Sequence, residues 1–251
     1  MKGILVPEKG IVKPFLRRNG FKAISNFGSF ASYMSPLLED MVVVTGASGE
    51  STLTATERLI SEYAPNFVIS IGFGTSLDFS VSVGSVILCE EIISLNGPMA
   101  LWSKGSGSPI DVPSSRSMQA LFDNLNHDEN KRSYPRGRAV SAPEFVTNKN
   151  MKLWLGEEFD SLLIERDGTL VAEACNRYGV PFAILRSINN PRSNTVSTFS
   201  GRLESMTRSQ RIKAALLPQN VMPYLIFLSR RRRAKRKIEQ VISRLHSLVL
   251  P

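Results

Sequence analysis

A glycine-containing segment directly after an apolar run is the first feature of this sequence that could carry chemistry. Residues 67–72 are almost continuously apolar, as in a strand buried on both faces, and Gly72-Phe73-Gly74 follows. Glu90 and Glu91 come roughly twenty residues later, the spacing at which an acidic side chain binds the ribose of a dinucleotide. The residues after Gly74, however, do not open a helix, and the third glycine of that motif is absent. A dinucleotide site is therefore not expected here.

Other self-contained catalytic motifs are also missing. The chain has neither a Gly-Lys-Ser/Thr phosphate-binding loop nor a Gly-x-Ser-x-Gly nucleophile elbow. Its two histidines, His127 and His246, form no cluster with metal-ligand spacing, so no zinc site is expected. Its two cysteines, Cys89 and Cys175, lie in separate apolar segments, which predicts buried thiols in a reducing compartment rather than a disulfide framework.

The elements that must position any site alternate between strands and helices. Helical spacing of apolar residues predicts a helix that starts near Ser51 or Thr54, another from Met118 to Leu125 and a third that ends at Gly179. Such alternation predicts an α/β fold: a single domain with a central mixed β-sheet flanked by helices. Apolar or β-branched runs predict strands at 3–6, 41–45, 67–72, 81–93, 162–165 and 182–188, with the Ser-, Gly- and Pro-rich residues 103–116 as a loop.

Positive charge is concentrated near the end of the chain. The 251 residues carry a formal net charge of +9, and residues 230–237 contribute seven positive charges, whose removal leaves +2. We therefore predict a domain over 1–202 and a basic, helical C-terminal extension over 203–251. Three interpretations of Arg230–Lys237 stay open: a solvated helix face or flexible end, a surface for nucleic acid or an anionic membrane, or a helix that packs on a partner subunit.

A cytoplasmic location is expected from the absence of targeting and spanning segments. Glu8, Lys9 and Lys13 interrupt the first apolar run before the core of a signal peptide forms. The apolar stretch at 221–228 contains Pro223 and is far shorter than the ~20 residues that span a bilayer.

Three segments, in this order, carry a family pattern. Residues 44–93 run from a strand through Gly46-Ala47-Ser48-Gly49, a helix and the Gly72 turn to Val83-Gly84-Ser85-Val86-Ile87 and two acids. Residues 138–159 begin Arg-Ala-Val-Ser and lead to a short helix. Residues 164–190 join Ile-Glu-Arg-Asp-Gly to Gly-Val-Pro-Phe and Arg-Ser-Ile-Asn-Asn. Together they resemble the purine and uridine phosphorylase superfamily, especially its methylthioadenosine/S-adenosylhomocysteine nucleosidase branch, over residues 1–195.

The resemblance implies an enzyme that cleaves the N-glycosidic bond of a nucleoside, as a nucleosidase or a phosphorylase. Cleavage builds positive charge on the ribose and negative charge on the base, so the site needs a carboxylate at the sugar and a hydrogen-bonding group at the base. By resemblance, Arg166 and Asp167 bind the ribose and Asn190 is catalytic and faces the base. The base-binding positions are Phe145, as the stacking ring, with Val146, Asn190 and the turn Gly72, Phe73 and Gly74.

Several of these positions depart from the family pattern. Asn190 replaces an ionisable Asp, and its amide suits an oxo group and a ring N–H better than adenine. Phe73 and Ser70 stand where phosphorylases carry phosphate-binding Ser or Thr and Arg, so inorganic phosphate as a co-substrate has little support. Glu8 is the only carboxylate near the position of the family's water-orienting Glu, although a gap-free comparison places Ile11 there. We assign Glu8 as the second catalytic candidate, and we expect no metal or organic cofactor.

Each assignment has a structural alternative. Asp167 can cap the helix that follows it, Phe145 can belong to the core, Asn190 can form a turn, and Glu8 can be an ordinary surface residue. Arg166, charged where the family is apolar, pairs with an acid or meets an anionic ligand.

Three hypotheses about function follow. The chain is an enzyme of nucleoside metabolism, or it is a degenerate family member that binds a nucleoside or nucleotide without catalysis, or its basic C-terminal segment drives association with nucleic acid or a membrane. The first is preferred. Family members commonly assemble, so the resemblance also implies a homo-oligomer.

Overall fold

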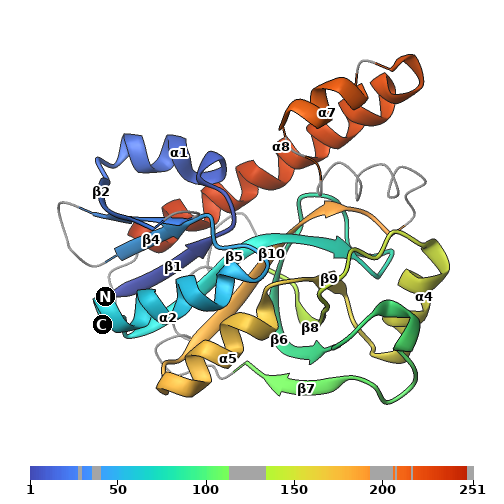
Figure 1. Ribbon diagram of the computed structural model, residues 1–251, viewed down its shortest axis with the longest axis horizontal. Helices are drawn as coiled ribbons and strands as arrows, with labels where there is room; N and C mark the ends of the chain where they lie inside the picture. Colours follow the sequence, from blue (N-terminus) through green and yellow to red (C-terminus); the bar gives the residue numbers. More distant parts are fainter. Residues whose placement is uncertain are drawn as a thin grey trace.

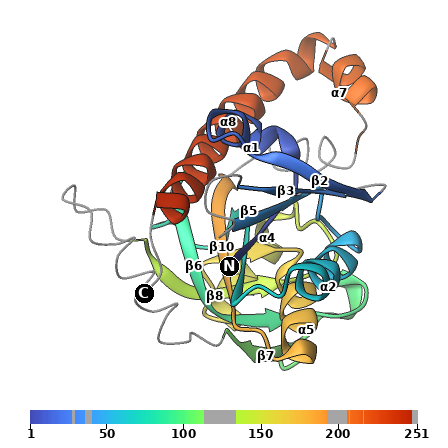
Figure 2. The ribbon, with the colours of Figure 1, turned by 90° about the vertical axis from the view of Figure 1, so that its left-hand side faces the viewer.

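One twisted mixed sheet with helices on both faces forms the protein (Figures 1 and 2). The structure is a computed structural model that describes residues 1–27, 30–35, 41–112, 134–192, 206, 208–215 and 217–247. The predicted α/β fold with a central mixed sheet is confirmed. The predicted helix at 118–125 and the predicted domain boundary at 202/203 lie outside the described residues.

Within the described residues the sheet has ten strands, in the order β10-β6-β8-β9-β5-β1-β4-β3-β2, with β7 on β6. Strand β5 also pairs with β10, so β5, β10, β6, β8 and β9 close into a ring. The strands are β1 (Lys2–Val6), β2 (Lys22–Phe27), β3 (Phe30–Met34), β4 (Met41–Thr45), β5 (Phe67–Ser76), β6 (Val86–Ser94), β7 (Ser108–Asp111), β8 (Arg136–Ser141), β9 (Leu163–Glu165) and β10 (Phe182–Asn190).

The two faces of the sheet are covered by different helices because successive strand residues point to opposite sides. In β1, Ile4 and Val6 join a core with α1 and α8, whereas Leu5 joins a second core with α2 and α5. The helices are α1 (Lys9–Arg18), α2 (Ser51–Tyr63), η1 (Met99–Leu101), α4 (Lys149–Glu158), α5 (Gly168–Tyr178), α7 (Arg208–Ala215) and α8 (Pro218–Ser247).

Two local expectations are wrong. Residues 72–74 do not form a turn, because β5 continues through them to Ser76 and pairs with β10 over this stretch. Residues 108–111, expected as loop, form β7 and extend the edge of the sheet at β6. In both places backbone pairing with a distant strand satisfies the amide groups, and this outweighs the local Gly and Pro signals.

The basic segment is part of the long helix α8. The C-terminal half of α8 packs on the sheet and on α1. Its buried side chains there are Ala234, Ile238, Val241, Ile242 and Leu245. Its first turns project from the body together with α7 (Figure 1). None of the helices in the described part of the chain combines the length and the apolar composition of a membrane-spanning segment.

Candidate functional site

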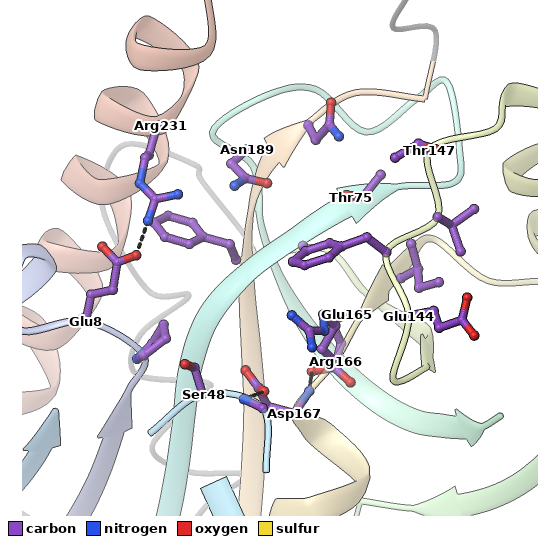
Figure 3. A pocket seen from close by; sticks show the side chains of 18 residues that line it. Glu8, Ser48, Thr75, Glu144, Thr147, Glu165, Arg166, Asp167, Asn189 and Arg231 are labelled. Carbon is purple, nitrogen blue, oxygen red and sulfur yellow. Dashed lines mark hydrogen bonds and ion pairs between the residues drawn. The ribbon is translucent and has the colours of Figure 1, made fainter. Parts of the chain in front are cut away.

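A pocket of about 180 Å³ opens where β5 and β10 end, beside the loop before α4 and one face of α8 (Figure 3). Parallel strands bring their carboxyl ends to the same edge of a sheet, which is why segments distant in sequence meet here. Of the nine residues assigned to the site from the sequence, eight line the pocket: Glu8, Phe73, Gly74, Phe145, Val146, Arg166, Asp167 and Asn190.

Gly72 is the assigned residue that the lining does not include. It pairs with Arg186 in the β5–β10 register, and a Cβ at this position would lie 3.6 Å from Nη1 of Arg186. Gly74, two residues on, is hemmed in by Leu163, whose Cδ1 would lie 3.2 Å from an added Cβ. The glycine at 74 therefore lets the strands pack closely under the pocket.

A fully buried ion pair supports the pocket floor. Arg186 donates to Oε2 of Glu165 from Nε at 2.9 Å and from Nη2 at 2.6 Å, and both side chains are at most 1% exposed. Burial alone lowers the pKa of Arg186, but the carboxylates of Glu165 and Asp167 outweigh it and raise the pKa. Arg186 also donates to the carbonyl and hydroxyl oxygens of Ser70. The pair therefore locks β9, β10 and β5 together.

Glu165 also decides the orientation of Asp167. The Glu165 carboxylate accepts hydrogen bonds from the backbone N–H groups of Asp167 and Gly168, which begin α5. Asp167 makes no side-chain cap hydrogen bond to its own helix, and its Oδ1 instead accepts from the backbone N–H of Gly49 at 2.7 Å. Gly49 has a φ of 59°, a conformation that favours glycine. The carboxyl of Asp167 therefore faces the pocket instead of capping α5.

The surroundings of Asp167 hold its pKa above the ordinary value of an aspartate. Burial and the nearby charge of Glu165 raise the pKa of Asp167, while Arg186, the Gly49 N–H and Arg166 oppose the change. A carboxyl with a raised pKa can change its protonation state closer to neutral pH than an exposed Asp does.

Arg166 and Phe145 form a stacked pair on one wall. The guanidinium carbon of Arg166 lies 4.2 Å from the Phe145 ring centroid, and its Nε donates to the carbonyl of Pro143 at 3.1 Å. Phe145 is 37% exposed and lines the pocket, so it is not an ordinary core residue, whereas its neighbour Val146 is 6% exposed and belongs to a core cluster. Arg166 thus covers one face of the ring, and it forms no salt bridge with an acidic side chain in the described part of the chain.

The opposite wall joins the start of α1 to α8. Glu8, just before α1, forms an ion pair with Arg231, and its other carboxylate oxygen lies 3.7 Å from Nζ of Lys235. The guanidinium of Arg231 also lies over the ring of Phe73, 4.9 Å from the centroid. Glu8 is therefore not an ordinary surface residue, and the basic segment contributes directly to the pocket.

Asn190 ends β10, next to a register shift, and its Cα partner is Thr75 of β5. It is therefore a strand residue at the pocket rim rather than part of a turn. Asn189 lies beside it in the lining.

Sequence reasoning did not assign Glu165, Arg186 or Arg231 to the site. Glu165 and Arg186 stand inside the motifs quoted for the family resemblance, so their positions carried a signal. Arg231 carried none, because it is one of seven positive charges within residues 230–237. Glu8, its ion-pair partner, lies 223 positions earlier.

Comparisons with known proteins agree with this fold. Residues 14–217 match the family model described as the Phosphorylase superfamily. A 5'-methylthioadenosine/S-adenosylhomocysteine nucleosidase of Staphylococcus haemolyticus is 24% identical over 164 residues, covering 63% of this chain and 72% of the relative.

Two solved structures from Helicobacter pylori have the same fold. The native futalosine hydrolase superimposes with a TM-score of 0.73 at 18% identity, covering 98% of this chain and 96% of the other. An Asp-to-Asn variant of the methylthioadenosine/S-adenosylhomocysteine nucleosidase, solved with 5'-methylthioadenosine in its active site, gives a TM-score of 0.69 at 18% identity, covering 96% and 97%.

Proposed function

Because the chain belongs to the Phosphorylase superfamily, we propose that it binds a nucleoside in this pocket and cleaves its N-glycosidic bond. The membership confirms the resemblance inferred from the sequence, and the relatives it matches are named as nucleosidases. The observation that carries the proposal is the convergence of Asp167, Phe145 and Asn190, from three separate segments, on a single pocket.

Each of these side chains suits one part of the reaction. Asp167 can accept hydrogen bonds from ribose hydroxyls and stabilise the positive charge that grows on the sugar. Phe145 offers the face that Arg166 does not cover to the base, and stacking on an aromatic ring orients it. Asn190 can donate to and accept from the edge of the base as negative charge develops there.

Glu8 is the proposed group for orienting the attacking water, and its contacts with Arg231 and Lys235 compete with that role. A carboxylate that already accepts a hydrogen bond from Arg231 has fewer lone pairs left to orient water. Inorganic phosphate is the alternative nucleophile in a phosphorylase reaction.

The second candidate function is binding without catalysis. Two observations favour it: Asn190 offers an amide where an ionisable acid would protonate the base, and Glu8 is engaged by two cations. In the Helicobacter pylori nucleosidase an Asp-to-Asn exchange is compatible with 5'-methylthioadenosine in the active site.

The test is release of free base from inosine, guanosine, adenosine, methylthioadenosine and uridine, with and without phosphate. We expect Asp167→Ala and Asn190→Ala to abolish release if the protein is an enzyme. If the folded wild type binds one of these nucleosides but releases no base, the binding function replaces the enzymatic one. Release only with phosphate identifies a phosphorylase, and release without it identifies a nucleosidase.

The remaining assignments concern partners and location. We propose a homo-oligomer, supported by the exposed apolar side chains Leu217, Val221, Met222 and Leu225 at the projecting end of α8, and sedimentation velocity tests it. A cytoplasmic location is proposed from the two buried free cysteines, and cell fractionation tests it.

An anionic partner for Arg230–Lys237, nucleic acid or membrane, is proposed only for the outward side chains of the run. Arg232 and Arg236 are exposed, whereas Ala234 is buried and Arg231 lies in the pocket. Because α8 contributes to the core, the appropriate test replaces only Arg232 and Arg236, each by Gln. We expect the wild type to bind polyanions or anionic vesicles in a salt-dependent manner, and the variant to lose this binding.

A further inference from the structure

One outward stripe of α8 has two chemically different halves. Exposed side chains follow each other along it at alternating spacings of three and four residues, which places them on one face of the helix: Met222, Leu225, Ser229, Arg232 and Arg236. Met222 and Leu225 are 65% and 53% exposed and stand on the first turns of α8, which project from the body (Figure 1). The stripe is therefore apolar at its projecting end and cationic closer to the body.

The opposite side of α8 serves the fold and the pocket. Phe227, Ala234 and Ile238 are buried against the body, and Arg231 lines the pocket. The side chains of the outward stripe belong to neither the core nor the pocket lining. Substitutions on the stripe can therefore test a surface role without disturbing nucleoside binding.

The segment around the stripe carries positive charge without any acid. Residues 208–213 contribute three positive charges and residues 230–237 contribute seven, and the sequence has no Asp or Glu from residue 205 to 238. A partner that pairs with this segment is therefore negatively charged. The same partner has to cover apolar side chains, because a group of exposed apolar residues marks an interaction surface.

An anionic lipid bilayer answers both halves of the stripe. Its headgroups attract Lys and Arg, and its acyl boundary takes up the apolar side chains of a helix that lies in the interface. A nucleic acid would pair with Arg232 and Arg236 and leave Met222 and Leu225 in water. A second copy of the chain that packs the same stripe on this one would cover the apolar turns and bring the arginines no counter-charge.

We propose that the outward stripe of α8 is a docking surface for an anionic membrane. Met222 and Leu225 enter the headgroup region, and Arg232 and Arg236 contact the lipid phosphates beside them. Val221, which is 45% exposed, precedes Met222 on the same turn and enlarges the apolar end. The inference rests on the anionic partner proposed above for the basic run, and it names that partner. Because few apolar side chains enter the bilayer, the association is peripheral and reversible.

The experiment measures co-sedimentation of the full chain with vesicles of phosphatidylcholine, alone or mixed with phosphatidylglycerol, at low and at physiological salt. Heparin and a single-stranded RNA are the polyanions that offer no apolar phase. The charge variant is Arg232→Gln/Arg236→Gln. Its matched control, Lys104→Gln/Lys149→Gln, removes two exposed positive charges from other elements.

The apolar half of the stripe is tested separately. Leu225→Ser removes an apolar side chain from the projecting end, and the matched control Leu101→Ser removes one that is 71% exposed on η1. Leu225→Trp and Leu101→Trp place a fluorescent ring at the same two positions. A blue shift of the Leu225→Trp emission on mixed vesicles reports entry of this side chain into the bilayer.

We expect the wild type to bind mixed vesicles and not phosphatidylcholine alone. The charge variant should bind about 30-fold more weakly, because each cation near an anionic surface contributes about a factor of five. Leu225→Ser should weaken vesicle binding about tenfold through the lost apolar burial, and it should bind heparin like the wild type. Both controls should bind like the wild type, and only Leu225→Trp should show the blue shift.

Four results overturn the inference. Full vesicle binding by Leu225→Ser, with no blue shift in Leu225→Trp, leaves an anionic partner but rejects docking of the apolar end. Binding to RNA and heparin without binding to mixed vesicles assigns the basic run to nucleic acid. An oligomer that Leu225→Ser dissociates, with vesicle binding unchanged, assigns the apolar end to a subunit interface. A wild type that binds no vesicle and no polyanion rejects the proposed anionic partner as well, while nucleoside cleavage is decided by its own assay.

Discussion

Removing the charge of Glu165 should destabilise the protein far more than removing a surface charge. In Glu165→Gln the shape is retained, but Arg186 stays buried at 1% exposure without its counter-charge. The new amide N–H₂ also faces donors, because the carboxylate oxygens accept from Arg186, Asp167 and Gly168. Breaking a buried ion pair from one side costs about 3 to 5 kcal/mol.

The assay is urea unfolding followed by circular dichroism. Thermal unfolding is a second measurement of the same change. At about 2 to 4 °C per kcal/mol for a chain of this size, a loss of about 3 to 5 kcal/mol in the free energy of unfolding lowers the thermal midpoint by roughly 6 to 20 °C. The matched control is Glu173→Gln, which removes the charge of an exposed pair with Arg177 and should change the free energy of unfolding by about 0.5 kcal/mol or less.

The double variant Glu165→Gln/Arg186→Met separates two causes of the lost stability: the uncompensated charge of Arg186, and the new amide N–H₂ group that faces other donors. Because it removes the uncompensated charge, it should recover part of the lost free energy, and simple additivity of the single changes would contradict this explanation. A cost below about 1 kcal/mol for Glu165→Gln would refute the reasoning altogether, since the pair would then not be acting as a buried charge pair.

Three further predictions concern titration and packing. The pKa of Asp167 is raised in the folded state, so this group favours folding at low pH and loses that contribution as pH rises through the raised pKa. In chemical unfolding, the stability of Asp167→Asn relative to wild type should therefore increase as pH rises above about 4, by about 1.4 kcal/mol per unit of the shift, and a pH-independent difference would contradict it. Lys152 is fully buried, its Nζ has no hydrogen-bond partner among the residues that the structure describes, and burial lowers its pKa to about 8. Charging this buried amine costs free energy of folding; the cost is absent above the pKa that Lys152 has in the unfolded chain and is fully present below pH 8. Lys152→Met should therefore stabilise the protein at pH 7 by up to about 3 kcal/mol and by much less at pH 10.5. Ile242→Ala should cost about 2 to 5 kcal/mol in urea unfolding because Ile242 of α8 is fully buried, and a cost below about 1 kcal/mol would mean that α8 is not part of the core.

Much of the fold could be predicted because its signals are local. The run Met41–Thr45 is β-branched and is a strand, and the apolar stripe of 168–178 forms a helix that ends at Gly179, which has a φ of 66°. Residues 72–74 could not be predicted in the same way. Their glycines signal a turn locally, but pairing with β10 extends the strand through them.

Candidate residues for the site could likewise be named, but not their partners. The motif at 164–168 pointed to Asp167. Only the folded chain shows that the Glu165 carboxylate accepts the hydrogen bond from the first backbone N–H of α5, and that Asp167 accepts one from Gly49, 118 positions away. The alternatives in which Asp167 caps its helix and Phe145 fills the core were also compatible with the sequence.

The sequence by itself determined that strands and helices alternate, the α/β class and the family, because hydrophobic periodicity and short motifs are properties of neighbouring residues. The tertiary structure alone decided that one arginine of the basic run, Arg231, meets Glu8 across 223 positions at the pocket. The physical reason is that an ion pair depends on the distance between two charges in space, and hydrophobic burial of α8 on the sheet sets that distance.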